Sequence, residues 1–404
     1  MTTSGERIRQ WRGPALFSFG FRPFFLGAGA WAVFTMTLWM LMLTGNVVLP
    51  SNFDPVSWHA HEFLYGYLGA VLAGFLLTAV PNWTGRLPIV GWPLATLFAL
   101  WILGRVAVLC GEMLAPWLVA VADLAFPVVL IVAIGIETVL GRNWRNGIVL
   151  AAVTVFAAGN ALYHLENAAG EAAQQEVGLR LGLAASVMMI AIIGGRIVPS
   201  FTRNWLAKRQ ANSFPAAPMG KFDRIALLIL FVSLVAWVAA PTKDYTGAAL
   251  IAAGIVHLAR LARWKGETTI AEPLLLILHV GYSFVPLGAL ALAYSVFFPD
   301  RMGSVDAQHL WMAGAIGIMT IAVMTRAILG HSGQALTAGN GTVLVYGAIA
   351  LSVVVRFGAG WVSVDVMQLY SLSGLCWILG YLGFLVLYGS HLMTYGNNAR
   401  SKSG

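Results

Sequence analysis

The chain is poor in charge and in cysteine. Only 10% of its 404 residues are Asp, Glu, Lys or Arg, against roughly 25% in soluble domains, while 59% are hydrophobic. This composition excludes an ordinary soluble protein and an intrinsically disordered one. The two cysteines, Cys110 and Cys376, lie far apart in apolar surroundings. Their number and spacing exclude an iron–sulfur cluster, covalent attachment of c-type haem and a zinc ribbon.

Apolar runs fill almost the whole chain. A membrane-spanning helix needs ~20 apolar residues, and Gly, Pro or polar residues separate twelve such runs. We therefore predict an all-α polytopic membrane protein, with residues 1–404 forming a single integral-membrane domain. The predicted spans are 24–45, 57–80, 92–110, 115–140, 146–166, 176–199, 223–240, 245–262, 270–298, 306–329, 341–359 and 365–390.

The excess of basic residues, a formal net charge of +8, lies between the apolar runs. This placement indicates membrane orientation rather than binding to nucleic acid. With the N-terminus on the cytoplasmic side, 18 of the 24 Lys and Arg residues fall in cytoplasmic segments and three lie within or at the ends of spans. Only Lys243, Arg301 and Arg356 fall in outer loops. We predict that both termini are cytoplasmic.

Four histidines from three predicted spans lie at a similar depth near the outer surface: His59, His61, His164 and His309. Two carboxylates, Glu62 and Glu166, accompany them. Imidazole and carboxylate together suit copper, zinc or iron, and Glu62, Glu166 or Asn160 could orient the second nitrogen of a ligating histidine. The four histidines are thus candidate metal ligands, although single interfacial histidines are often merely hydrated.

His59 and His61 are only two residues apart, so on a regular helix their side chains point ~200° apart. They cannot both bind one ion from a regular turn. Either the start of this helix is irregular, or the two histidines serve different partners.

Two further histidines, His257 and His279, lie near the middle of the membrane, where ionisable groups are costly. Each could be a neutral histidine bonded to a carbonyl, or an axial ligand of a non-covalent haem. We favour His279 for haem, with His331 as the second ligand. Arg196 and Arg326 could hold the haem propionates, although positive-inside anchoring explains most cytoplasmic arginines. In the fourth span, Asp123 and Glu137 could serve a proton path or simply bond to neighbours.

Several of these stretches together resemble the NnrS family, over most of the chain. The matching motifs are FRPFFL at 21–26, WHAHE at 58–62, GFLLTAVPNWTG at 74–85, HLE at 164–166, GGRIVPSFT at 194–202, LHVGY at 278–282 and HLWMAGAIGIMTIAVMTRAILGHSG at 309–333. The most specific pair is WHAHE with PNWTG.

The resemblance implies a twelve-span protein of the bacterial inner membrane that contains haem b and copper. It also implies a role in nitric oxide tolerance or denitrification, with nitric oxide or a related small molecule as ligand. It does not define a reaction or an electron donor. Two alternatives remain open from the residues: a proton-coupled transporter or exporter, and a quinol-linked haem electron-transfer protein.

Overall fold

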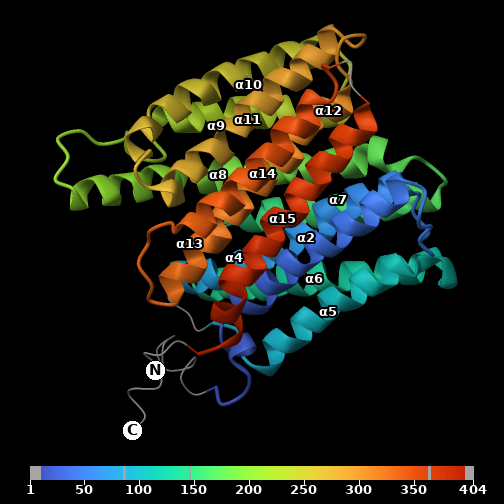
Figure 1. Cartoon of the computed structure of the whole chain (residues 1–404), viewed down its shortest axis with the longest axis horizontal. Helices are drawn as coiled ribbons and strands as arrows, with labels where there is room; N and C mark the ends of the chain where they lie inside the picture. The colour runs from blue at the N-terminus through green and yellow to red at the C-terminus, as the bar shows by residue number, and fades with distance from the viewer. Residues whose placement is uncertain (1–10, 85–87, 143, 145–146, 363–364, 396–404) are drawn as a thin grey trace. The chain divides into compact units, whose positions relative to one another are not determined.

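The structure is a computed structural model that describes residues 11–84, 88–142, 144, 147–362 and 365–395. Some of the predicted cytoplasmic cations, such as Arg86, lie outside the described residues. The described part of the chain is helical, and twelve of its helices are long and apolar enough to cross a membrane (Figure 1). The prediction of an all-α, twelve-span protein is confirmed. The cytoplasmic position of the termini stays a prediction.

Ten of the twelve spans are continuous α-helices: α2 (Phe21–Leu43), α5 (Trp92–Leu109), α6 (Pro116–Leu140), α7 (Gly147–Ala168), α8 (Val177–Lys208), α9 (Lys221–Ala239), α10 (Asp244–Ala262), α11 (Pro273–Phe297), α14 (Asn340–Gly358) and α15 (Val366–Met393). Short 3₁₀ turns lie between or before them, at Ala15–Ser18, Gly111–Met113, Ala173–Gln175 and Gly266–Thr269. Apolar length thus defined the spans to within a few residues at most ends.

The two remaining spans each contain a π-helical segment. One consists of α3 (Pro55–His61), η2 (Glu62–Tyr67) and α4 (Leu68–Thr84), and the other of α12 (Ser304–His309), η7 (Leu310–Ile318) and α13 (Met319–His331). In both, the π-helical turn begins directly after a histidine, His61 or His309. Because π-helical turns are rare and often mark functional sites, these two positions stand out from the other spans.

Local sequence signals account for several helix starts. Pro55, Pro116 and Pro273 each occupy the first position of a helix, where the missing N–H has no intrahelical partner to lose. The Asp54 carboxylate caps α3 by accepting hydrogen bonds from the N–H groups of Val56 (2.9 Å) and Ser57 (3.1 Å). These caps fix where the histidine-bearing start of the second span lies.

Helix α8 is longer than the sequence predicted, because it continues past the apolar run to Lys208. The first part of the connection predicted at 200–222 is therefore helical. Its polar turns are held by local contacts: Thr202 Oγ1 donates to the carbonyl of Val198 (3.0 Å), and the Arg209 guanidinium lies over the Trp205 ring (4.2 Å).

The chain divides into two compact units. The first unit comprises Met1–Gly182, Ala327–Gln334 and Tyr381–Gly404, and the second comprises Leu183–Arg326 and Ala335–Gly380. In the first unit, Arg22 of the FRPFFL motif donates to the carbonyl oxygens of Leu392 (3.3 Å) and Thr394 (2.8 Å) at the end of α15. This arginine therefore ties α2 to the C-terminal helix.

Candidate metal centre

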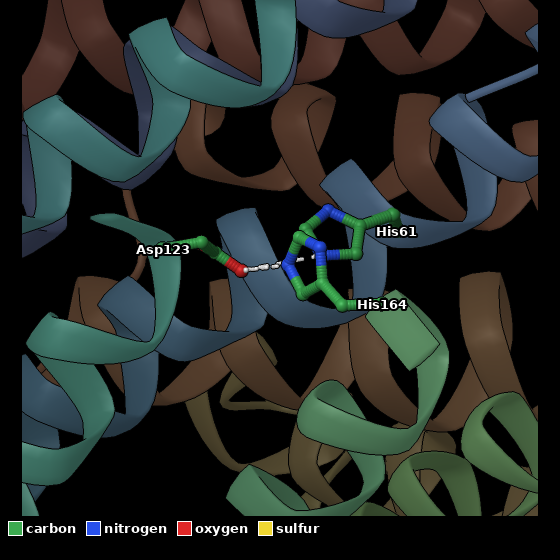
Figure 2. Close-up of side chains that lie close together, drawn as sticks. All are labelled: His61, Asp123 and His164. Atoms are coloured by element: carbon green, nitrogen blue, oxygen red, sulfur yellow. Dashed lines mark hydrogen bonds and ion pairs between the residues drawn. The ribbon is translucent and has the colours of Figure 1, made fainter. Parts of the chain in front are cut away.

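Three helices of the first unit bring His61, Asp123 and His164 together. His61 is the last residue of α3, Asp123 lies two turns into α6, and His164 lies near the end of α7. Their exposed fractions are 0%, 2% and 7%, so the cluster is closed to bulk water. Figure 2 shows the Asp123 carboxylate directed at the two imidazole rings. One potential ligand atom from each residue lies within 4.8 Å of the other two.

The spacing of these atoms fits a small transition-metal ion. Asp123 Oδ2 lies 3.3 Å from His61 Nε2 and 3.0 Å from His164 Nε2. Two ligands about 2.05 Å from a metal in tetrahedral geometry are about 3.3 Å apart. An ion could therefore bind among these three atoms with small side-chain adjustments. Two imidazoles and one carboxylate form a donor set that suits copper, zinc or iron.

A buried arginine balances half of the negative charge at this centre. The Arg105 guanidinium, 3% exposed, contacts Glu62 Oε1 through Nη1 (2.7 Å) and Asp123 Oδ1 through Nη2. Glu62 is fully buried, and its other oxygen accepts a hydrogen bond from Trp31 Nε1 (2.7 Å). With neutral imidazoles, two carboxylates and one guanidinium leave one negative charge. In a low-dielectric interior, that charge favours a bound cation, or a second proton on His61, whose two nitrogens both face acceptor oxygens.

Neighbouring groups fix the orientation of both imidazoles. His61 bonds through Nδ1 to Glu62 Oε1 (3.0 Å) and through Nε2 to Asn160 Oδ1 (2.9 Å). Asn160 also donates from Nδ2 to Asp123 Oδ2 (2.8 Å). The Phe53 ring covers the imidazoles, with centroid distances of 5.0 Å to His61 and 5.5 Å to His164. Such preorganisation reduces the movement that metal binding requires.

A tryptophan of the neighbouring helix α5 donates a hydrogen bond to a backbone carbonyl of the π-helical turn η2. Trp101 Nε1 of α5 donates to the carbonyl of Gly66 (2.9 Å). A side chain at residue 66 would collide with this network, because an added Cβ would lie 2.4 Å from Arg105 Nη1 and 2.8 Å from Glu62 Oε2. Glycine is therefore required here for the close approach of the ion pair.

Of the four outer histidines of the sequence prediction, the structure brings His61 and His164 together. His61 and His164 belong to the cluster, whereas His59 stacks on Trp39 (4.4 Å) and contacts Phe63 (4.8 Å). The different surroundings of His59 and His61 agree with their helical offset. His309 belongs to the second unit, where its Nδ1 donates to the carbonyl of Val305 (2.8 Å).

The two carboxylates proposed to orient histidines also differ. Glu62 bonds to His61, as that proposal requires. Glu166 instead accepts two hydrogen bonds from the N–H of Gly178, at 2.9 and 3.1 Å, and so ties the end of α7 to the start of α8.

Two members of the centre were missed or left open by the sequence. Asp123 was one of two undecided acids in the fourth span, and Arg105 was only counted among the cations within spans. A usable signal was present, because an acid and a base inside neighbouring apolar runs are costly unless they pair. Pro127 is a second signal at this position of α6. Because proline has no N–H, the backbone carbonyl of Asp123, one helical turn earlier, receives no hydrogen bond from residue 127.

The structure places His279 on α11, with its two ring nitrogens in different surroundings. The histidine is 5% exposed, and its Nε2 bonds to Thr202 Oγ1 (2.9 Å). On the other side of the ring, the Gly266 backbone is so close that a Cβ there would lie 2.8 Å from Nδ1. Nδ1 is buried and has no hydrogen-bond partner among the described residues, and the role of His279 with haem stays a prediction.

The other residues predicted for haem are spread over both units. His331 belongs to the first unit, where Phe21 stacks on its ring (5.4 Å) and Phe19 contacts it (4.9 Å). Arg196 and Arg326 are half-buried in the second unit, and the Arg326 guanidinium lies over the Phe201 ring (4.2 Å). Their role with haem stays a prediction.

A second buried charge cluster occupies the second unit. Arg260, which is fully buried, donates from Nε to Asp223 Oδ1 (2.7 Å) and from Nη1 to the hydroxyl of Tyr282 (2.7 Å). His257 bonds through Nδ1 to the same hydroxyl (2.8 Å) and through Nε2 to the carbonyl of Ala226 (3.1 Å). Both nitrogens of His257 thus make hydrogen bonds, as expected for a buried histidine that stabilises the fold.

Twelve candidate spanning helices in the described residues, together with a buried cluster of two histidines and one aspartate, define a polytopic membrane protein with a candidate transition-metal centre. The chain belongs to the NnrS family: the family model described as NnrS protein matches residues 15–395. No curated protein matches the chain. Membership of this family supports, in general terms, a membrane protein of the nitric oxide response and the binding of metal or haem.

Proposed function

We propose that this protein is a copper-binding protein of the bacterial inner membrane that captures nitric oxide or a metal–nitrosyl species and thereby relieves nitrosative stress. The cluster of His61, Asp123 and His164 carries the proposal, because its donor atoms have the spacing of a small metal site. Copper is favoured within this donor set, because affinity for divalent first-row metals peaks at copper. Open coordination positions on a bound copper would accept a diatomic ligand.

The arrangement defines what each residue would contribute. His61, Asp123 and His164 would hold the ion, Glu62 and Asn160 would orient His61, and Arg105 would hold both carboxylates in place. The copper proposal stands on this cluster alone; haem, which the family resemblance also implies, keeps His279 and His331 as its candidate ligands.

Metal analysis of purified protein tests the proposal directly. We expect about one copper ion per chain after copper loading, because a preformed site binds a metal that its deprotonated ligands fit. His61→Gln, His164→Gln and Asp123→Asn should each lose most of this copper. His59→Gln and His309→Gln are matched controls from the same outer depth and should retain it.

Two results would contradict the proposal. One is copper at the wild-type level in all three cluster variants. The other is zinc in place of copper in protein purified from cells grown with both metals. Elution volume and thermal unfolding of each variant show whether the loss of copper reflects the site rather than a loss of folding.

A further inference from the structure

Three spans of the second unit have their ends in a surface that is rich in basic side chains. Helix α8 ends at Lys208, α9 begins at Lys221 and α10 ends at Ala262. All but the last of the cations at these ends, which is half-buried, are exposed. They form what we call the basic surface: Arg203, Lys208, Arg209, Lys221, Arg224, Arg263 and Lys265.

The connection between α8 and α9 is folded against the ends of α8 and α10. Arg203 of α8 donates from Nη2 to the carbonyl of Pro215 (2.6 Å). The N–H of Ala216 donates to the carbonyl of Arg263, directly after α10 (3.0 Å). These hydrogen bonds hold segments that are far apart in the sequence side by side, so the cations form one surface.

Little negative charge accompanies these cations. Within 203–224 and 263–267 the carboxylates are Asp223 and Glu267. Asp223 is buried and bonded to Arg260, so its charge is already balanced, and Glu267 is exposed. In the part of the chain that the structure describes, none of the seven cations forms an ion pair with a carboxylate. The basic surface therefore has an excess of positive charge to offer a partner.

The length of α8 places this surface at the depth of the lipid headgroups. Its 32 residues span about 48 Å at 1.5 Å per residue, whereas a bilayer is about 40–45 Å thick including its headgroups. A helix of this length that starts at one surface of the membrane ends among the headgroups of the other leaflet. On α9 the apolar run begins only after Arg224, with Ile225 (56% exposed), so this helix enters the hydrocarbon at the same boundary.

Aromatic rings lie among the cations and favour a lipid over a soluble partner. Three guanidinium groups lie over rings: Arg209 over Trp205 (4.2 Å), Arg263 over Phe222 (4.6 Å) and Arg203 over Phe214 (5.6 Å). Aromatic side chains are typical of the membrane–water interface, and an arginine stacked on a ring keeps N–H groups that can bind a phosphate in its own plane. A phospholipid offers both the phosphate and hydrocarbon, whereas an acidic soluble protein offers mainly the charge.

We propose that the basic surface binds the headgroups of anionic phospholipids in the leaflet where α8 ends. Juxtamembrane clusters of Lys and Arg attract anionic lipids, and here the fold gathers cations from three span ends that the sequence separates. The inference is independent of the candidate metal centre, which belongs to the first unit.

The test uses the full-length protein in dodecyl maltoside, titrated with phosphatidylglycerol or with phosphatidylcholine of the same acyl chains. Native mass spectrometry measures the bound lipid. One variant removes four exposed cations of the basic surface but keeps Arg203 and Arg263, which contact the connection: Lys208→Gln, Arg209→Gln, Lys221→Gln and Arg224→Gln. A matched control removes the same charge from four exposed cations elsewhere: Arg12→Gln, Arg142→Gln, Lys243→Gln and Arg301→Gln.

We expect wild-type protein to bind phosphatidylglycerol about tenfold or more tightly than phosphatidylcholine, which corresponds to about 1.4 kcal/mol. The basic-surface variant should lose most of this preference, and the control variant should keep it. Thermal unfolding of each protein shows that the fold is intact. If the fourfold variant does not fold, Lys208→Gln with Arg209→Gln should lose part of the preference.

Four results would overturn the proposal. Wild-type protein that binds both lipids equally has no preference for an anionic headgroup. An undiminished preference in the basic-surface variant places the lipid elsewhere. Equal losses in the two fourfold variants make net charge, rather than this surface, the cause. Displacement of phosphatidylglycerol by millimolar glycerol phosphate makes a free phosphate ester, rather than a lipid, the ligand.

Discussion

Substitution of Gly66 by alanine should break the ion-pair network that supports the candidate metal centre. The added Cβ would lie 2.4 Å from Arg105 Nη1, 2.8 Å from Glu62 Oε2 and 3.1 Å from Trp31 Nε1. Relief of the closest contact requires the guanidinium to retreat by about 1 Å, and a hydrogen bond stretched by that amount is lost. The affected bond is the 2.7 Å contact between Arg105 and Glu62.

The size of the effect follows from two opposing contributions. Disruption of a buried ion pair costs about 3–5 kcal/mol because it leaves an uncompensated charge. Replacement of a helical glycine by alanine stabilises a helix by about 1 kcal/mol. We therefore expect Gly66→Ala to lower the free energy of unfolding by about 2–4 kcal/mol and to reduce bound copper.

Gly69→Ala is the matched control for stability, because the glycine lies one helical turn further along the same span and its added Cβ would be 3.8 Å from the nearest atom. This variant should be as stable as wild type or about 1 kcal/mol more stable. Unfolding by dodecyl sulfate in mixed micelles, followed by far-ultraviolet circular dichroism, compares the three proteins. Equal stability of Gly66→Ala and Gly69→Ala would refute the argument that residue 66 must be glycine to admit the arginine.

Three further predictions address protons, the second unit and orientation. Copper affinity measured by equilibrium dialysis should fall as the pH drops below about 6.5, because protons compete for the imidazole nitrogens. A copper affinity that stays constant from pH 8 to pH 5.5 would argue against histidine ligands. Arg260→Met should lower the free energy of unfolding by about 3 kcal/mol, because it leaves the Asp223 carboxylate buried without its arginine partner. Adding Asp223→Asn should recover part of that loss. If the double variant is no more stable than Arg260→Met, the broken ion pair is not the cause of the loss. A reporter fused after Gly404 should be cytoplasmic and one within 167–175 should be periplasmic, because of the distribution of basic residues. A periplasmic reporter at Gly404 would contradict the predicted orientation.

The sequence alone determined the fold class and the approximate position of every span. The reason is that the hydrocarbon thickness of a membrane sets the length of an apolar helix, so run length is sufficient without tertiary contacts. The same topology gave His59, His61, His164 and His309 a common depth. Depth is one coordinate, however, and it does not specify which histidines share a neighbourhood.

Only the tertiary structure decided which residues form the centre. In a membrane, the side of a helix that faces lipid is as apolar as the side that faces other helices, so hydrophobic pattern does not reveal the inward face. Asp123 and Glu137 on α6 looked equivalent in the sequence, yet Asp123 alone contacts His61, His164 and Arg105. That selection depends on how α6 is rotated against α5 and α7, and helix packing sets that rotation.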